Sequence, residues 1–190
     1  WFVVDGKYTE SFDVTKDLAP VALVASQPSM LVVHPSLPVK SVTQLIALAK
    51  SKPGEILYSS GGSGSASHFA AELFRSTAGI KLLHVPYKGA GPAAIALIAG
   101  EVHMLVTNMA SLLPHMKSGR VRALAVTGAT RARAAPELPT LAEAGLPGCV
   151  FDGWYGLLVP ARTPGAVVTK INEDSNRALA APDLKQRLAD

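Results

Sequence analysis

The chain has 190 residues, of which 48% are hydrophobic and 17% charged, so it contains enough apolar side chains to form a globular core. The formal net charge of +4 comes from scattered lysines and arginines that form no basic stripe with interleaved aromatic residues, which argues against nucleic-acid binding. No apolar run reaches the roughly 18 to 20 residues of a transmembrane helix. The single Cys149 excludes an intrachain disulfide and a cysteine-based metal cluster.

The chain opens with Trp1-Phe2-Val3-Val4, which has neither an initiator methionine nor a signal-peptide pattern and suggests a processed chain or a piece of a longer one. The first 19 residues show no clear periodicity and are expected to form an arm or linker. Strand-like and helix-like segments alternate after them. Strands are predicted at 30–34, 55–59, 81–87, 102–107, 121–127 and 151–159. Helices are predicted at 41–51, 66–78, 92–99, 110–118, 138–144, 164–180 and 182–189. Because helical crossovers of this length join parallel strands, the alternation predicts parallel pairing in an α/β fold with flanking helices.

The segment from Tyr58 to Phe69 is the most informative part of the sequence. It holds three glycines and five serines between a strand and a helix. A glycine-rich turn that opens a helix exposes backbone N–H groups beside the positive end of the helix dipole. The segment therefore predicts a binding site for an anionic group such as a carboxylate or phosphate. The alternative is a structural turn in which Ser65 or Ser67 caps the helix.

Sharper motifs do not fit this loop. A nucleophile elbow would need a glycine where Ser65 stands, and an ATPase-type phosphate loop would need a lysine that the segment lacks. The dinucleotide fingerprint matches at Gly62 and Gly64 but has Ser67 in place of its last glycine. The next strand, 81–87, also lacks the acidic residue that would hold a ribose, so nucleotide binding is not expected.

Other candidate residues follow neighbouring strands, because ligands in open α/β sheets bind where loops leave the carboxyl ends of strands. This rule places Tyr87 and Lys88 after one strand and Thr107 and Asn108 after another, on the same edge as the serine-rich loop. The alternatives are a solvated strand end for Tyr87 and Lys88, and a helix cap for Asn108. Trp154 is a candidate wall of the same cleft, although aromatic residues in strands often pack in a core.

The sequence shows few residues in patterns that are typical of catalytic or metal sites. The five histidines show no i, i+4 pair, so no metal site and no cofactor is predicted. Glu72 is expected to be solvated, and His68 is a candidate to orient the serine-rich loop. These observations favour a protein that binds without chemistry. The rival hypothesis is a hydrolase with Ser63 or Ser65 as nucleophile and His68 as base, and a third is a scaffold without a ligand.

Several separate motifs, in order, resemble one family. They are Asp17-Leu18-Ala19-Pro20-Val21-Ala22-Leu23-Val24, Leu31-Val32-Val33-His34-Pro35-Ser36-Leu37-Pro38, 58–68, Val85-Pro86-Tyr87-Lys88-Gly89-Ala90-Gly91-Pro92, Arg122-Ala123-Leu124-Ala125-Val126-Thr127 and Leu138-Pro139-Thr140-Leu141-Ala142-Glu143-Ala144-Gly145. Together they resemble the Bug (TctC-like) periplasmic solute receptors of tripartite tricarboxylate transporters. The likeness extends from about residue 13 to the end.

The resemblance implies a two-lobed, Venus-flytrap (type II periplasmic-binding-protein-like) fold that binds small carboxylates or dicarboxylates and delivers them to a membrane permease. It implies that 20–150 form lobe two, that 151–190 return towards lobe one, and that most of lobe one is absent. A bare lobe surface would favour self-association. The candidate ligand-binding residues are Ser60, Gly62, Ser63, Gly64, Ser65, Ser67, His68, Tyr87, Thr107, Asn108 and Trp154. The expected mechanism is capture of a carboxylate by the N–H groups of 62–65 and the serine hydroxyls.

The chain departs from the family pattern at a few polar positions. Many relatives carry Asn at Ser63 and Thr at Ser65, and both serines keep a hydrogen-bonding group. Many also carry Asp immediately before Asn108, where this chain has Thr107. The loss of that negative charge suggests a plain carboxylate or dicarboxylate as ligand rather than one with an amino group.

Overall fold

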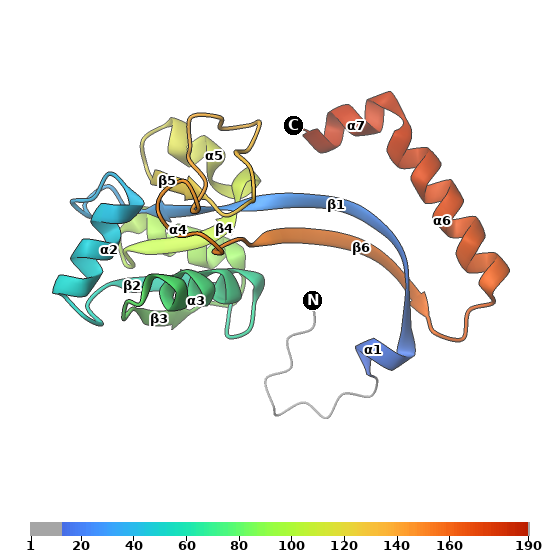
Figure 1. Cartoon of the computed structure of the whole chain (residues 1–190), viewed down its shortest axis with the longest axis horizontal. Helices are drawn as coiled ribbons and strands as arrows, with labels where there is room; N and C mark the ends of the chain where they lie inside the picture. Colours follow the sequence, from blue (N-terminus) through green and yellow to red (C-terminus); the bar gives the residue numbers. More distant parts are fainter. Residues whose placement is uncertain (1–12, 190) are drawn as a thin grey trace. The chain divides into compact units, whose positions relative to one another are not determined.

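The computed structural model describes residues 13–189, and the described residues form two compact units (Figure 1). One unit comprises 27–153, and the other comprises 13–26 together with 154–189. The division inferred from the family resemblance, with borders near 20 and 150, stays a prediction. The first twelve residues of the expected arm, 1–19, lie outside the described residues.

The first unit is built on a mixed β-sheet. Its strands are β1 (Leu18–Val33), β2 (Leu57–Ser60), β3 (Leu83–Pro86), β4 (Met104–Asn108) and β5 (Arg122–Val126), in the order β3-β2-β4-β1-β5, and β6 (Asp152–Pro160) also pairs with β1. β2 runs parallel to β3 and to β4, as the sequence predicts. β1 runs antiparallel to β4 and β5, so the expectation of parallel pairing is wrong there. Neither β4 nor β5 follows β1 directly in the chain, so no helical crossover fixes the direction of these pairs.

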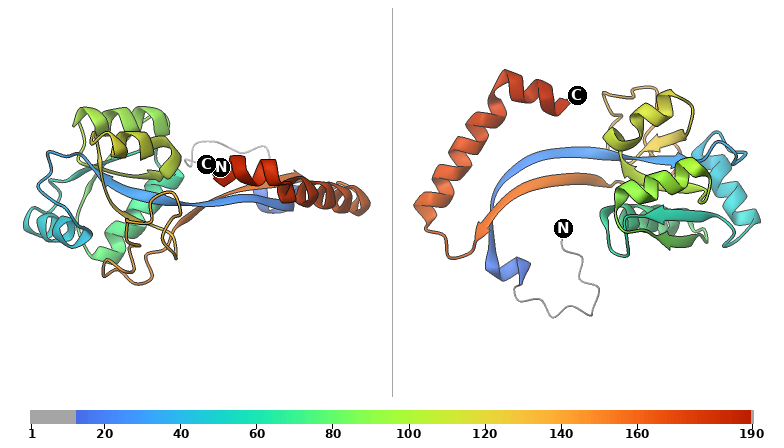
Figure 2. Two further views of the ribbon diagram at one scale, coloured as in Figure 1. Left: turned by 90° about the horizontal axis from the view of Figure 1, so that it is seen from above. Right: turned by 180° about the vertical axis from the view of Figure 1, so that it is seen from behind.

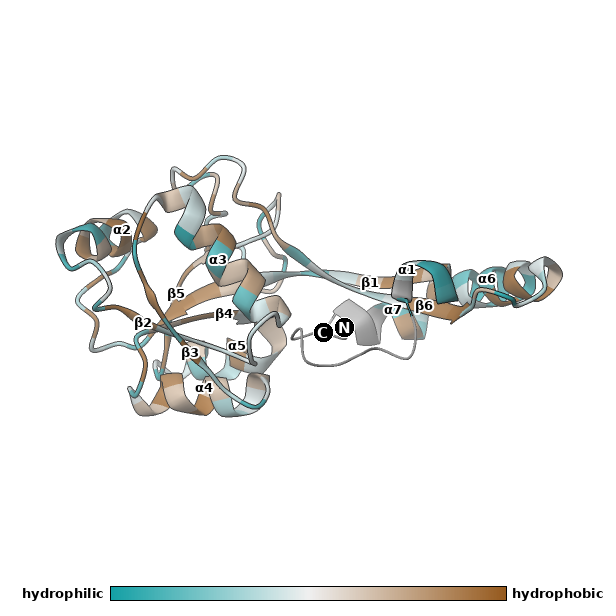
Figure 3. Ribbon diagram, turned by 90° about the horizontal axis from the view of Figure 1, so that it is seen from below, coloured by the Kyte–Doolittle hydropathy of each residue, from teal (hydrophilic) through white to brown (hydrophobic). Residues whose placement is uncertain are grey.

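Helices cover both faces of this sheet (Figure 2). α2 (Val42–Ser51) and α3 (Ala66–Ala78) lie on one face, and α4 (Ala90–Ala99) and α5 (Met109–Lys117) lie on the other. Side chains of β1 alternate between the two: Leu31 and Val33 pack under α2 and α3, whereas Met30 and Val32 pack under α4 and α5. Figure 3 shows the resulting concentration of hydrophobic residues on the strands between the helix layers. The α/β class predicted from the sequence is confirmed.

Most helix ends lie close to where the sequence predicts them. Ser41 caps α2 through a 3.2 Å bond from the N–H of Gln44, and Gly79 ends α3 in the left-handed conformation, with φ of 60°. The helix predicted at 138–144 is wrong, because this segment forms turns. Its backbone pairs with Val126 instead: the N–H of Val126 donates to the carbonyl of residue 139, and the N–H of residue 141 donates to the carbonyl of Val126.

The second unit contains α1 (Val14–Asp17), α6 (Gly165–Ala180) and α7 (Pro182–Ala189), together with the parts of β1 and β6 that lie outside the first unit. The side-chain amide of Asn172 on α6 donates to the carbonyl of Val21 at 2.5 Å. No residue of α6 is buried, and Leu23 on β1 is 63% exposed. Across residues 13–189, no helix combines the length and the apolar character needed to cross a membrane.

Candidate functional site

Three helices begin at one edge of the sheet. β3, β2 and β4 are adjacent and parallel, so their carboxyl ends lie at the same edge, and each is followed by a helix: β2 by α3, β3 by α4 and β4 by α5. The N-terminus of a helix carries a partial positive charge and unpaired N–H groups. This edge is therefore suited to an anion, as the sequence predicts from the order of strands and loops.

The loop from Ser60 to Ser65 is shaped by two glycines and capped by serines. Gly62 and Gly64 have φ of 123° and 75°, values that L side chains rarely adopt. Ser65 is the N-cap of α3, and its hydroxyl accepts a 3.3 Å bond from the N–H of His68. The hydroxyl of Ser67 accepts from the N–H of Gly61 at 2.9 Å. The structural-turn interpretation of these serines thus holds, and it leaves a binding role for the loop open.

The loop that follows β3 is bonded directly to this loop. The N–H of Tyr87 donates to the carbonyl of Ser60 at 2.9 Å, and the N–H of Gly89 donates to the carbonyl of Gly61 at 3.1 Å. A Cβ added to Gly61 would lie 3.1 Å from the backbone nitrogen of Ala90, so a side chain there would force the two loops apart by a few tenths of an ångström. The N-termini of α3 and α4 therefore meet through glycine backbones.

Several N–H groups of the loop are already used within the protein. Gly62 donates to the hydroxyl of Ser60 at 3.1 Å, Gly64 to Nδ1 of His68 at 2.9 Å, and Ser65 to the carbonyl of Gly62 at 3.1 Å. Of the four N–H groups expected to hold a carboxylate, only that of Ser63 has no acceptor among residues 13–189. The N–H groups of residues 66 and 67, in the first turn of α3, also have no acceptor among residues 13–189.

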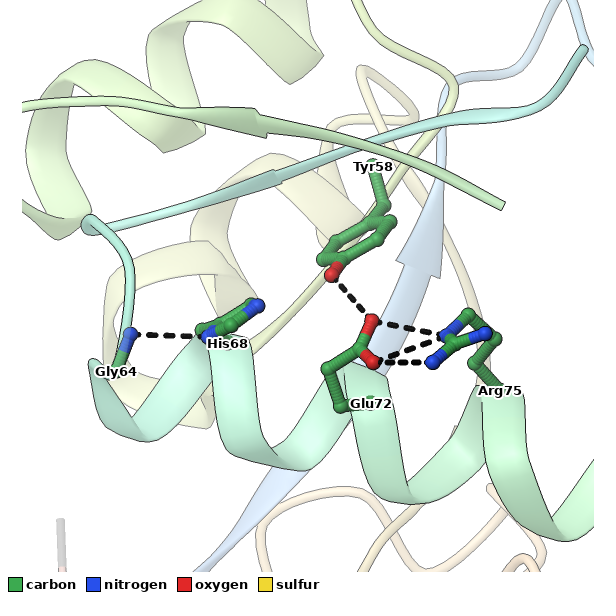
Figure 4. A network of polar contacts seen from close by, with 5 residues as sticks. All are labelled: Tyr58, Gly64, His68, Glu72 and Arg75. Carbon is green, nitrogen blue, oxygen red and sulfur yellow. Dashed lines mark hydrogen bonds and ion pairs between the residues drawn. The ribbon is translucent and has the colours of Figure 1, made fainter. Parts of the chain in front are cut away.

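A chain of polar contacts lies beneath the loop on α3 (Figure 4). The hydroxyl of the fully buried Tyr58 donates to Oε1 of Glu72 at 2.6 Å, and Arg75 donates to both oxygens of Glu72. Burial raises the pKa of the Tyr58 phenol, and the bond to Glu72 adds to this effect. The bonds from Arg75 hold the pKa of the Glu72 carboxyl below its usual range, although burial opposes them. The expectation that Glu72 is solvated holds in part, since its side chain is 32% exposed but is also held by Tyr58 and Arg75.

Two histidines join this network to the loop. The ring of His84 stacks on that of His68, with centroids 4.2 Å apart, and on Tyr58 at 4.8 Å. Nε2 of His84 lies 2.6 Å from the hydroxyl of Ser60. Burial lowers the pKa of His84, and the nearby charge of His68 acts in the same direction, while Glu72 opposes both. The interpretation that His68 orients the loop agrees with its bond from Gly64, while His84 was not among the sequence candidates.

The remaining candidates occupy different surroundings. Thr107 is buried in β4, where it pairs with residue 30 of β1. Asn108 is the N-cap of α5, and its side-chain oxygen accepts from the N–H of Ser111 at 3.1 Å. The hydroxyl of Tyr87 makes a long, 3.4 Å contact with Glu101. Trp154 belongs to the second unit and is 45% exposed.

The catalytic alternative finds little support in this geometry. The hydroxyl of Ser65 accepts from the backbone N–H of His68 and contacts the hydroxyl of Ser67, so its described contacts do not include the imidazole. Nδ1 of His68 accepts from Gly64. Within residues 13–189, no group of three His, Cys, Asp or Glu side chains is placed to hold a metal ion.

Comparison with known proteins identifies the family. The model of the tripartite tricarboxylate transporter family receptor, TctC, matches residues 7–190. The chain belongs to this family. A UPF0065 protein from the tcbD-tcbE intergenic region of Pseudomonas sp. strain P51 is 41% identical over 174 residues, which cover 91% of the chain and 52% of that protein. Protein BugT of Bordetella pertussis is 35% identical over 178 residues, covering 94% and 55%. The chain thus spans about half the length of these curated relatives.

Solved structures agree with this assignment. An R. palustris protein solved with adipate superposes with a TM-score of 0.87 and 36% identity, covering 95% of the chain and 60% of that protein. MatC from Rhodopseudomonas palustris, with bound malate, gives a TM-score of 0.85 and 30% identity, covering 97% and 63%. The resemblance found in the sequence motifs is confirmed, and the chain has the fold of part of a periplasmic solute-binding protein.

Proposed function

We propose that the chain is part of a periplasmic receptor that captures a small carboxylate or dicarboxylate and delivers it to a tripartite tricarboxylate-type permease. The observation that carries the proposal is the close likeness to family members solved with adipate and with malate, both of which are dicarboxylates. The serine–glycine loop adds a physical reason, because its unpaired N–H groups stand at the N-terminus of a 13-residue helix.

In the proposed mechanism, one carboxylate of the ligand binds at the beginning of α3 without any chemical step. The N–H groups of Ser63, Ala66 and Ser67 donate to it, since other N–H groups of the loop are used to hold its shape. The hydroxyl of Ser63 supplies a further donor, and so does one of the hydroxyls of Ser65 and Ser67, since the other proton of that pair is used in their mutual 3.0 Å bond. Charge-assisted hydrogen bonds of this kind contribute on the order of 1.5–3 kcal/mol each. Tyr87 and Asn108, at the ends of β3 and β4, are proposed to contact the same ligand.

Thr107 is the residue from which we infer the ligand class. A buried, neutral threonine stands immediately before Asn108, and it offers no negative charge to an ammonium group. We therefore expect the ligand to lack an amino group near this position. The exchange Thr107→Asp should move the preference towards amino acids, whereas Thr107→Val removes the hydroxyl without adding charge. An unchanged preference in both variants would mean that position 107 does not contact the ligand.

The test of the proposed function is a thermal-shift screen of the chain against monocarboxylates, dicarboxylates, amino acids and nucleotides. The R. palustris protein solved with adipate serves as the positive control for the assay. A ligand at 100 times its dissociation constant should stabilise the folded state by about 2.7 kcal/mol, a shift of a few degrees or more. A shift with one class of carboxylate supports the proposal. A flat response to every carboxylate, from a chain that melts cooperatively, contradicts it.

A further inference from the structure

The two residues that give the serine–glycine loop its shape are each held by one histidine. Gly64 donates its N–H directly to Nδ1 of His68 at 2.9 Å. Gly62 is held through Ser60, whose hydroxyl lies 3.1 Å from both the N–H and the carbonyl of Gly62 and 2.6 Å from Nε2 of His84. These two glycines are the positions of the loop with positive φ. Both histidines therefore act on the backbone geometry that a bound carboxylate would meet.

The hydrogen-bond pattern assigns the protons of the pair. The hydroxyl of Ser60 has one proton and three contacts, and all three become hydrogen bonds only if the hydroxyl donates to the carbonyl of Gly62 and Nε2 of His84 donates to the hydroxyl. Nδ1 of His68 accepts from Gly64, so it must carry a lone pair. An imidazolium at His68 would present an N–H to the N–H of Gly64, and this bond would be lost.

The surroundings of the pair fix the rings in place. Tyr58 from β2 stacks on His84, and the two imidazoles are nearly parallel, with an angle of 16° between their planes. Among residues 13–189, the titratable groups beside the pair are Tyr58 and Glu72, and the carboxylate of Glu72 is already engaged by Tyr58 and by Arg75. A proton on one ring opposes a proton on its neighbour, since the two centroids are only 4.2 Å apart.

We propose that His68 and His84 are positioning residues that hold the serine–glycine loop in its carboxylate-receiving shape, and that this shape requires a neutral His68. The inference rests on the proposed function for its ligand class, whereas the effect on the loop is independent of any ligand. Acidification that protonates His68 releases Gly64, and the loop then loses the geometry that presents the N–H groups of residues 63, 66 and 67. Carboxylate affinity should consequently be lower with His68 protonated than with His68 neutral.

The first test follows the loop without ligand, by NMR of the backbone amides in the full chain between pH 8 and pH 5. In the wild type, the Gly64 amide signal should move with the titration of the His68 ring. In His68→Asn, which keeps an acceptor near the position of Nδ1 but cannot be protonated, the Gly64 amide should not move in this range. In His68→Phe, which keeps a flat ring but has no acceptor, it should be displaced at every pH. A wild-type Gly64 amide that ignores the His68 titration overturns the proposal.

The second test measures adipate and malate affinity by calorimetry over the same pH range. The affinity of the wild type should fall roughly three- to tenfold on acidification, which is the loss expected for one hydrogen bond. The affinity of His68→Asn should not change with pH beyond the titration of the ligand itself, which is common to both proteins. His84→Gln, whose amide can still donate to Ser60, should bind more tightly than His84→Phe. Tighter wild-type binding at low pH, or equal affinities of His84→Gln and His84→Phe, overturns the proposal. If neither compound binds at any pH, the proposed ligand class is contradicted, and the NMR titration alone decides the role of the histidines.

Discussion

The phenol of Tyr58 donates a 2.6 Å hydrogen bond to Oε1 of Glu72, 14 residues later in the chain (Figure 4). This bond joins strand β2 to the middle of α3, about two turns beyond the loop at which the helix begins. Glu72 is held from the other side by Arg75, whose guanidinium donates to both carboxylate oxygens. The orientation of α3, and hence of its N-terminus, is therefore coupled to the sheet by polar contacts as well as by its apolar face.

We expect Tyr58→Phe to lower the free energy of unfolding by about 1.5 kcal/mol, because the variant leaves the half-buried Glu72 with one bond fewer. The matched control is Tyr87→Phe, which removes a 3.4 Å contact to Glu101 at a partly exposed position and should have little effect. Urea unfolding of both variants measures the difference in the free energy of unfolding, and its dependence on urea concentration should be the same in both. Equal losses in the two variants would mean that the Tyr58 bond adds nothing beyond packing.

Two serine caps allow binding to be separated from stability. Ser65 caps α3 at the candidate site, and Ser41 caps α2 elsewhere on the same unit. Replacing either serine by alanine should cost about 1 kcal/mol of stability. Only Ser65→Ala should also weaken carboxylate binding, because its hydroxyl is a proposed donor to the ligand. Calorimetric titration of both variants checks this, and an equal loss of affinity in Ser41→Ala would contradict a direct role for Ser65.

The close contact between Gly61 and the start of α4 predicts opposite effects for two glycine substitutions. Gly61→Ala places a Cβ 3.1 Å from the backbone nitrogen of Ala90, so the two loops must separate at a cost of about 1–3 kcal/mol. Gly165→Ala adds a Cβ in open space at the start of α6, and it should stabilise the chain by up to about 1 kcal/mol because alanine favours helix. Thermal unfolding of the two variants should therefore show a lowered melting temperature for Gly61→Ala and an unchanged or raised one for Gly165→Ala. A Gly61→Ala variant as stable as Gly165→Ala would contradict the tight contact.

Between pH 7 and pH 5, partly buried histidines should contribute to the pH dependence of stability. Burial lowers the pKa of His103, and the nearby charge of His34 acts in the same direction. Nδ1 of His103 accepts from the N–H of Leu57 at 2.9 Å, which requires an unprotonated nitrogen. Since the folded pKa lies below the ordinary value of about 6.5, the unfolded chain binds the proton first as the pH falls. The free energy of unfolding should therefore decrease from about pH 6.5 down through the lowered pKa.

The shift of His84 has the same sign, so His103→Asn should reduce the slope of stability against pH without abolishing it. Urea unfolding at several pH values measures this slope in the wild type and the variant. The carboxyls of Glu72 and Glu143 have lowered pKa values, so their contribution is lost only at more acidic pH. Identical slopes for the wild type and His103→Asn between pH 7 and pH 5 would contradict this account.

Local signals in the sequence were sufficient for much of the candidate site. The serine–glycine loop, the Ser65 cap and the left-handed Gly79 all depend on residues within a few positions of one another, so they can be recognised without knowledge of the fold. The alternation of strands and helices also placed the ends of β2, β3 and β4 at one edge, because short helical crossovers impose parallel pairing. The motifs of the family could be recognised in the same way.

The tertiary structure decided the contacts between residues distant in sequence. His84 stands 24 residues after Ser60, and Glu72 looked like a solvated helix residue, so neither carried a local signal of its role. The direction of β1 was likewise set by partners far along the chain, β4 and β5, rather than by a crossover. The sequence by itself thus determined where the candidate anion-binding loop lies and to which family the chain belongs. The fold alone determined which N–H groups remain unpaired among the described residues, because that depends on side chains that packing brings beneath the loop.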